Sequence, residues 1–95
     1  MAKRKVFFNG KFVDESEAKV SIYDSSLMFG DMVFEMTRSF NSKQWKLDEH
    51  IDRLFAGIKI LRIPVDFSKK YVKDKVLETI EVNKPAFEPD DEHRI

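Results

Sequence analysis

No cysteine occurs anywhere in the sequence. Its absence excludes disulfide bonds, thiol nucleophiles and metal or iron–sulfur sites built on cysteine, and it is typical of a reducing compartment. Net charge is absent as well, because 17 Lys and Arg residues balance 17 Asp and Glu residues. Without an excess of either sign there is no electrostatic basis for binding nucleic acid or an anionic membrane, and we expect neither partner.

Long hydrophobic runs are also missing. The basic N-terminus leads into an apolar stretch of only Val6 to Phe8, which is too short for the hydrophobic region of a signal peptide. No run approaches the roughly 20 apolar residues that cross a membrane. We therefore expect a cytoplasmic protein. The 95 residues, 42% of them hydrophobic and nine of them Phe, predict one small domain over 1–95.

Two β-hairpins are predicted in the first half of the chain. The first turns at Asn9-Gly10, which tolerates the positive φ angles of a type I′ turn. The second has arms at 33–40 and 44–47, with residues 41–43 as its turn. Between the hairpins, residues 19–23 are compatible with a short strand, and the sequence "YDSS" that begins at Tyr23 reads as a turn.

The second half has the periodicity of two helices. In the first, Asp48 is the expected N-cap and Pro64 ends the helix. In the second, Ser68 is the expected N-cap and Pro85 marks the limit. Their apolar faces, spaced as on one side of a helix, comprise Ile51, Leu54, Phe55, Ile58 and Leu61 in the first and Val72, Val76, Leu77 and Ile80 in the second.

Strands followed by helices favour an α+β fold, in which antiparallel hairpins are followed by two helices packed on the sheet. About four short strands make a small sheet for two helices to cover. A hydrophobic run starting at Ile95 would extend this sheet. We therefore expect the chain to be either a fragment or a small domain that lacks its remaining strands.

Arg38 shares one row of the predicted strand with Phe34, Met36 and Phe40, because alternate residues of a strand face the same side. If that row is a core face, Arg38 needs an anion, and a carboxylate held by both arms of the guanidinium is one possibility. The alternative is an arginine near the strand end that reaches solvent. Chemistry alone favours the alternative.

Arg53 borders the apolar face of the first helix. It is either a rigidly presented ligand for phosphate or carboxylate, or a surface side chain paired with Glu49 one turn earlier, and chemistry alone favours the ion pair. His50 is expected to be a structural or exposed histidine rather than a general base. The acidic run Asp90–His93 is expected to be a solvated tail, because consecutive side chains diverge too much to hold a metal.

Four motifs in order resemble the N-terminal small domain of the class IV (fold type IV) pyridoxal-phosphate enzymes. They are "NGKFV" from Asn9, the aspartate at 24, "FGDMVFE" from Phe29 and "EHIDRL" from Glu49. The family includes branched-chain and D-amino-acid aminotransferases and aminodeoxychorismate lyases. The resemblance runs from Phe7 to about Val65, and weakly through the second helix.

The resemblance implies roles for four residues. Arg53 matches the arginine that binds the cofactor phosphate, and Phe34 matches an aromatic residue lining the substrate pocket. Arg38 matches an arginine of the branched-chain pattern that organises the side of the pocket nearest the substrate carboxylate. Phe29 matches a further substrate-binding position, but branched-chain relatives have Tyr there, and the loss of the hydroxyl weakens a branched-chain assignment. Met32 stands where most relatives have Gly.

The resemblance also implies what these 95 residues lack. The lysine that anchors pyridoxal phosphate covalently belongs to a large catalytic domain further along the chain, so no catalytic residue and no metal site are expected here. The complete protein is expected to move an amino group between an amino acid, possibly branched-chain, and a 2-oxo acid, as a homodimer. This part is not expected to be active alone.

Two alternatives remain open. One is a binding or interaction module that keeps the fold but performs no chemistry. The other is a lyase of the aminodeoxychorismate type, because residues of the small domain do not separate transamination from elimination. A downstream domain that carries the cofactor-anchoring lysine would discriminate an enzyme from a binding module.

Overall fold

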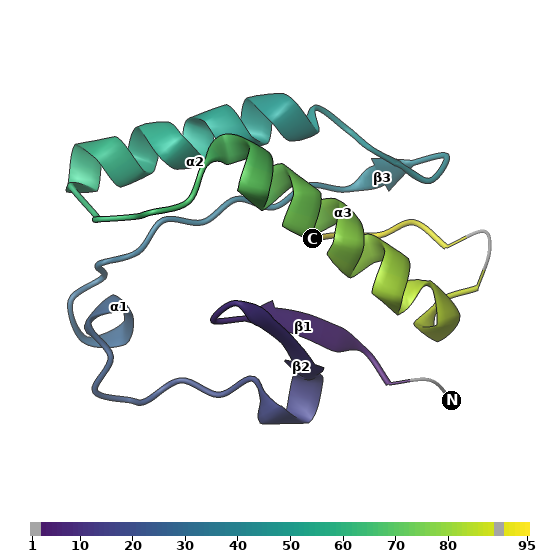
Figure 1. Ribbon diagram of the computed structural model, residues 1–95, viewed down its shortest axis with the longest axis horizontal. Coiled ribbons are helices and arrows are strands. Elements are labelled where there is room, and N and C mark those ends of the chain that lie inside the picture. The colour runs from purple at the N-terminus through teal and green to yellow at the C-terminus, as the bar shows by residue number, and fades with distance from the viewer. Residues whose placement is uncertain (1–2, 89–90) are drawn as a thin grey trace.

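The computed structural model describes residues 3–88 and 91–95. Two antiparallel hairpins are followed by two long helices, which confirms the predicted α+β class (Figure 1). The elements are β1 (Lys5–Phe8), β2 (Lys11–Asp14), a 3-10 turn (Glu15–Glu17), α1 (Ser25–Met28), β3 (Ser39–Phe40), β4 (Lys43–Gln44), α2 (Leu47–Leu61), α3 (Lys69–Asn83) and a second 3-10 turn (Lys84–Ala86).

The first hairpin forms where the sequence predicts it. Asn9 and Gly10 have φ angles of 50° and 86°, the two positive values that a type I′ turn requires. Phe8 consequently faces Lys11, and Phe7 faces Phe12. The rings of this last pair meet edge to face with centroids 5.1 Å apart, which gives the small sheet an aromatic side.

The second hairpin is much shorter than predicted. Ser39 pairs with Gln44 and Phe40 with Lys43, so the loop is the two residues Asn41-Ser42 rather than three. Both loop residues have positive φ angles, 52° and 66°, and thus form a two-residue turn without glycine. The expected arm over 44–47 ends early because Leu47 already begins α2.

The C-terminal residues pair with β3 and its approach. Asp91 and Glu92 are exposed, as expected for a solvated tail, but the chain here is not free, because Glu92 and His93 are hydrogen-bonded to Ser39. Ser39 N donates to His93 O (2.8 Å), while Thr37 and Ile95 exchange both backbone hydrogen bonds (2.8 and 3.0 Å). The antiparallel bridge lies at Arg38 and Arg94. Asp90, the first residue of the acidic run, lies outside the described residues.

No strand forms over 19–23, so this expectation is wrong. Asp24 instead caps α1, because its carboxylate accepts a hydrogen bond from Ser26 N (2.9 Å). The predicted turn is therefore a capped single helical turn. Ile22 and Tyr23 are 74% and 78% exposed, so their propensity for strand finds no neighbouring strand to pair with or pack against.

The two long helices occupy the predicted segments, but only one of their two predicted N-caps is found in the structure. The Ser68 side chain accepts a hydrogen bond from Tyr71 N (3.1 Å) and caps α3 as expected. Asp48, however, lies inside the first turn of α2, where its charge suits the helix dipole but its side chain caps nothing.

Among residues 3–88 and 91–95, no helix has the length and apolar composition needed to cross a membrane.

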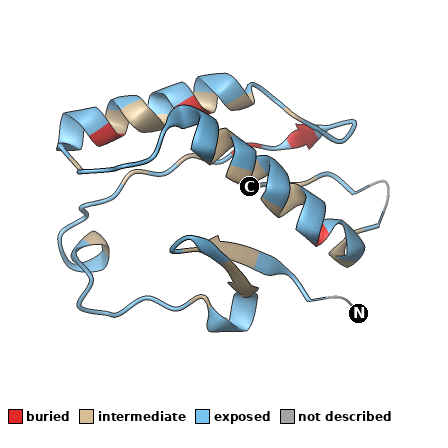
Figure 2. Ribbon diagram, in the orientation of Figure 1, coloured by how far each residue is buried: buried red, intermediate tan, exposed pale blue. Residues whose placement is uncertain are grey.

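The core is small and centred on α2. Among the described residues, its buried apolar side chains are Ile51 and Ile58, which lie two turns apart on one helical face (Figure 2). Gly57 lies beside them, and a Cβ at this position would come 3.0 Å from Val33 Cγ1. The absence of a side chain at Gly57 therefore lets the extended segment before β3 pack closely on α2.

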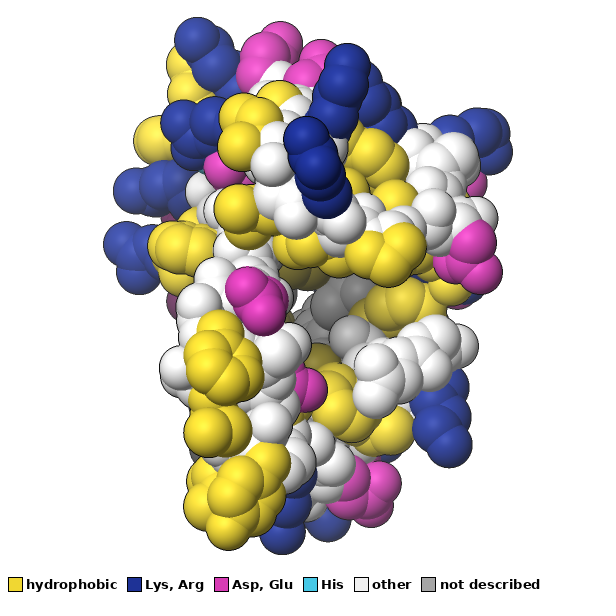
Figure 3. Space-filling view, turned by 90° about the vertical axis from the view of Figure 1, so that its left-hand side faces the viewer, with side chains coloured by type: hydrophobic (Ala, Val, Ile, Leu, Met, Phe, Trp, Pro, Cys, Tyr) yellow, Lys and Arg dark blue, Asp and Glu magenta, His cyan; other side chains and the backbone are white. Residues whose placement is uncertain are grey.

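Much apolar surface remains uncovered. The accessible surface is 7712 Å², whereas about 5,700 Å² is expected for a folded monomer of this mass. Large exposed side chains are frequent between residues 20 and 36, and hydrophobic groups border a hollow on one face (Figure 3). Surfaces of this extent are typical of contacts with further protein.

Candidate functional site

The row that contains Arg38 faces outward. Along 33–40, exposure alternates, with Phe34, Met36, Arg38 and Phe40 exposed and the residues between them half-buried or buried. Phe34 has 73% of its surface exposed. The segment therefore keeps the predicted strand-like alternation, but its buried side is the opposite row, so the row that contains Arg38 is not a core face.

Arg38 is held by neighbours at the protein surface. Its guanidinium carbon lies 4.3 Å from the centroid of the Phe40 ring, and its Nε donates to Ser39 O (3.2 Å). One terminal nitrogen lies 3.8 Å from Glu92 Oε2. With 44% of the side chain exposed, the guanidinium is thus restrained by a ring and a carboxylate while solvent still reaches it.

The inward row near the chain end is polar and fully hydrogen-bonded. Ser39, completely buried, donates to Glu92 Oε1 (2.9 Å) and accepts from His93 N (2.7 Å). Thr37 donates to Gln44 Oε1 (2.5 Å). The Ser39 bond, aided by backbone bonds from the Asn41 turn, lowers the pKa of Glu92. The Ser39 hydroxyl therefore joins β3 to the C-terminal residues, and the Thr37 hydroxyl joins the same segment to β4.

A cluster of three charged or titratable residues forms on the α2 side of the same segment. Arg53 donates from Nε to Glu35 Oε2 and from Nη2 to Glu35 Oε1, both at 2.7 Å. His50 Nδ1 lies 2.7 Å from the same Glu35 Oε1. Because His50 and Arg53 are three residues apart on α2, one helix face presents both to a single carboxylate.

The carboxylate of Glu35 is strongly stabilised in its charged form. Hydrogen bonds from Arg53 first and His50 second lower its pKa from 4.5 to about 2, against the opposing effect of partial burial. The same bond raises the pKa of Arg53. The side chain of Glu35 is 15% exposed and that of Arg53 is 72% exposed, so the acid is the inner and the arginine the outer member.

This shift predicts how acid affects stability. Since the folded-state pKa of Glu35 is depressed, its stabilising contribution is complete above about pH 4.5 and is lost as the pH falls toward 2. The free energies of unfolding of the native chain and of Glu35→Gln, measured by urea titration from pH 7 to 2.5, should therefore converge below pH 4.5. A difference that stays constant across this range would contradict the shift.

The other depressed carboxyl groups do not disturb that comparison. Hydrogen bonds from Lys5, Ser26 and Ser39 lower the pKa of Asp14, Asp24 and Glu92 respectively. All three groups are the same in both proteins, so their effects cancel in the difference between them.

Sequence reasoning missed Glu35 and assigned Arg53 to the wrong acid. Arg53 bonds to Glu35 rather than to Glu49, and His50 has a defined structural partner, as expected for a structural histidine. The signal was present in the alternation of the strand-like segment, because Glu35 falls in the row opposite Phe34 and Arg38. Which row faces α2 was the missing information.

The predicted substrate residues do not contact the arginine of this cluster. Within residues 3–88 and 91–95, no hydrogen bond, ion pair or cation–π contact joins Arg53 to Phe29, Phe34 or Arg38. Phe29 is 74% exposed and follows α1. Gly30 after it has φ 70°, which explains a glycine here, whereas Met32 has no positive φ, so a side chain is accommodated at that position.

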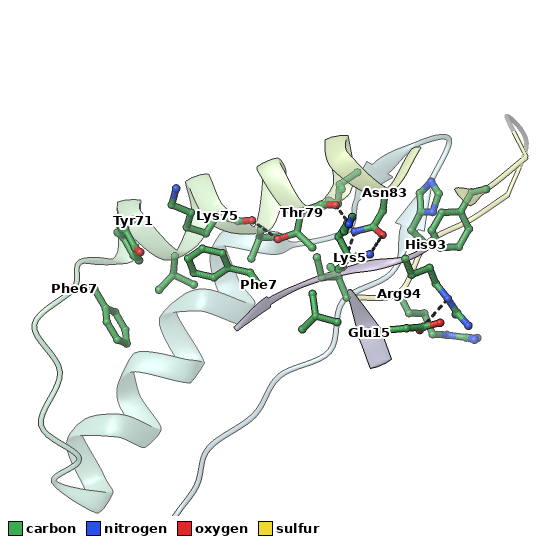
Figure 4. A pocket seen from close by; sticks show the side chains of 17 residues that line it. Lys5, Phe7, Glu15, Phe67, Tyr71, Lys75, Thr79, Asn83, His93 and Arg94 are labelled. Atoms are coloured by element: carbon green, nitrogen blue, oxygen red, sulfur yellow. Dashed lines mark hydrogen bonds and ion pairs between the residues drawn. The ribbon is translucent and has the colours of Figure 1, made fainter. Parts of the chain in front are cut away.

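A separate groove of about 590 Å³ lies between β1, α3 and the C-terminal residues. Phe7, Phe67 and Tyr71 line one end, and Asn83 bonds to the backbone of Lys5 near the other (Figure 4). Its lining is mainly apolar and contains no evident catalytic grouping. No group of acidic and histidine residues that could hold a metal occurs in the described part of the chain.

Comparisons with known proteins identify the family. Residues 32–95 match the family described as amino-transferase class IV. A putative branched-chain-amino-acid aminotransferase of Methanocaldococcus jannaschii is 48% identical over 79 residues, and a D-alanine aminotransferase of Bacillus licheniformis is 38% identical over 79 residues. Each alignment covers 83% of this chain, but only 27% and 28% of the relative.

A solved structure agrees. The branched-chain aminotransferase of Thermoproteus uzoniensis, crystallised with norvaline, superposes with a TM-score of 0.79 and 33% identity over 87% of this chain and 29% of that one. The chain thus spans little more than a quarter of these relatives. It belongs to the class IV aminotransferase family and corresponds to part of the N-terminal domain.

Proposed function

We propose that the chain is the small domain of a pyridoxal-phosphate-dependent amino-acid aminotransferase and that Arg53 binds the cofactor phosphate. The complete protein would transfer an amino group between an amino acid and a 2-oxo acid. Branched-chain amino acids are the first substrates to test, because the relative at 48% identity carries that name. D-alanine is the second substrate to test, because other relatives are named D-alanine aminotransferases.

The observation that carries this proposal is the presentation of Arg53. Two of its three nitrogens donate to Glu35, and the side chain is nevertheless 72% exposed. The Nη1 edge of the guanidinium is thus directed to neither carboxylate oxygen. A planar, permanently charged group with an open edge fits a phosphate dianion, so the residues present fit the phosphate end of the cofactor.

Phe34, Arg38 and Phe29 are proposed to contact the substrate. Phe34 and Arg38 share the outward row, and the Arg38 guanidinium remains accessible beside Phe40 and Glu92. An exposed aromatic ring and a restrained cation on one face suit a ligand with an apolar group and a carboxylate. In this arrangement the extended segment separates the substrate side from the phosphate side.

The remaining chemistry is assigned to residues outside this chain. Pyridoxal phosphate, when bound, supplies the electron-withdrawing ring that makes amino-group transfer possible. Our proposal places its covalent lysine in a large domain, so these 95 residues alone are inactive. The uncovered apolar surface supports contacts with that domain or with a second copy in a cytoplasmic homodimer.

The test uses the complete gene product that contains these residues. Arg53→Ala should weaken binding of pyridoxal phosphate about 10- to 100-fold, because a charged hydrogen-bonding group contributes about 1.5–3 kcal/mol. Absorbance titration measures the affinity. Affinity for pyridoxal, which lacks the phosphate, should not change.

Lys59→Ala is the matched control, because it removes a positive charge from the last turn of the same helix without touching Glu35. It should leave both affinities unchanged. Equal losses for pyridoxal and pyridoxal phosphate in Arg53→Ala, or no loss at all, would refute the phosphate role.

A further inference from the structure

The Glu35 carboxylate is the point where the extended segment before β3 is tied to α2. It accepts two hydrogen bonds from Arg53 and meets His50 Nδ1, with all three distances 2.7 Å. Glu35 is far less exposed than Arg53, 15% against 72%. The position of Glu35 is therefore set by the packing of its segment on α2. The position of the more exposed Arg53 guanidinium is set by its hydrogen bonds to Glu35.

The geometry restrains the plane of the guanidinium as well as its position. Parallel bonds from Nε and Nη2 to the two oxygens of one carboxylate form a fork-to-fork pair, which fixes the orientation of both planar groups. His50 also meets the shared oxygen Oε1, which limits rotation of the carboxylate. The Nη1 edge of Arg53, which does not bond to Glu35, is consequently held in a single orientation.

Two other acids of α2 are already engaged. Asp48 and Asp52, on the same helix, pair with Lys73 and Lys69 of α3 at 2.9 and 3.1 Å. Glu49 makes no salt bridge within residues 3–88 and 91–95, and Arg53 does not turn to it. Glu35 is thus the acid that determines the orientation of this arginine.

We propose that Glu35 is the positioning residue of the phosphate site, holding Arg53 in the orientation that a cofactor phosphate meets. The inference rests on the proposed function. An unrestrained arginine loses side-chain freedom when it binds an anion, and a side chain that is already ordered loses less. The ion pair with Glu35 orders Arg53 before the anion arrives.

The charge of Glu35 acts in the opposite direction. A carboxylate near the site repels a phosphate dianion, so its removal by itself would tighten binding. Positioning and repulsion can be separated, because Glu35→Asp keeps the charge but shortens the reach, whereas Glu35→Gln keeps the size but removes the charge.

The first experiment needs no ligand. In the complete protein without pyridoxal phosphate, the NMR signal of Arg53 Nε–H should be shifted and protected from exchange with water. It should revert to the values of a free arginine in Glu35→Gln and in Glu35→Asp. Glu49→Gln, a matched change on the helix, should leave the signal in place. An Nε–H signal that is identical in the native protein and both Glu35 variants would overturn the proposal.

The second experiment measures pyridoxal phosphate affinity in the complete protein. Ordering one long side chain is worth about 3- to 10-fold in affinity, so Glu35→Asp should weaken binding by about that factor. Glu35→Gln should also weaken it, but by less, because it removes the repelling charge as well. Affinity for pyridoxal should stay constant in both. Native affinity in Glu35→Asp together with tighter binding in Glu35→Gln would mean that Glu35 acts through its charge, and the proposal would be wrong.

The outcomes also separate this inference from the proposed function. If Arg53→Ala weakens phosphate binding while neither Glu35 variant does, the positioning role fails and the phosphate role of Arg53 stands. If Arg53→Ala has no effect, the proposed function fails and the positioning role fails with it. Far-UV circular dichroism of each variant checks that the helices remain folded.

Discussion

Replacing Ile58 by alanine should lower the free energy of unfolding by about 2–5 kcal/mol. Ile58 is 9% exposed and, with Ile51 at 6%, forms the buried apolar centre of α2. Truncation removes three buried carbons and leaves a cavity that the neighbouring segment fills only in part. A domain of this size has little stability to spare, so a large fraction of the variant should be unfolded at room temperature.

The same helix provides the control. Ile60 has the same side chain two residues later and is 78% exposed, so Ile60→Ala should change the stability by about 0.5 kcal/mol or less. Urea titrations followed by circular dichroism measure both variants. Similar losses for Ile58→Ala and Ile60→Ala would show that burial on this helix does not follow the described packing.

Replacing Asn83 by alanine should lower the free energy of unfolding by about 2–4 kcal/mol, from three lost hydrogen bonds at roughly 0.5–1.5 kcal/mol each. The Asn83 amide accepts from Lys5 N (2.7 Å) and donates to Lys5 O (2.9 Å) and Thr79 O (2.7 Å). It occupies the edge of β1 that β2 leaves free. Without it, two backbone groups of Lys5 lose their partners where α3 meets the hairpin.

Hydrogen exchange supplies a local readout. The Lys5 amide should exchange faster in Asn83→Ala, whereas the amides of α2 should change only with the global loss of stability. Glu81→Ala is the control in the last turns of α3, because its exposed ion pair with Lys84 contributes about 1 kcal/mol at most. Unchanged exchange at Lys5 in Asn83→Ala would disprove the proposed link between α3 and β1.

Local chemistry was sufficient to predict the first hairpin and the helices. Asn9-Gly10 suits a type I′ turn by its conformational freedom, and Ser68 caps α3 through its own hydroxyl. The apolar spacing of α2 predicted Ile51 and Ile58 on one face, and both are buried. These features depend on residues within a few positions of one another, so the sequence contains the necessary information.

Features that depend on distant partners were predicted less well. Residues 19–23 have the composition of a strand but no strand beside them, and the second hairpin is short because α2 already begins at Leu47. The Glu35–Arg53 pair joins residues 18 positions apart in the chain. The order of residues does not reveal such a pair until the segment before β3 packs on α2.

The sequence by itself therefore determined the class of fold, the family motifs and the alternation of 33–40. It did not determine which row of that segment faces the interior, because alternation has the same period on both sides. Tertiary packing decided it: close approach at Gly57 places the Glu35 row against α2 and leaves Phe34 and Arg38 outside. That choice gives Arg53 its acid, because only the inward row can reach the helix.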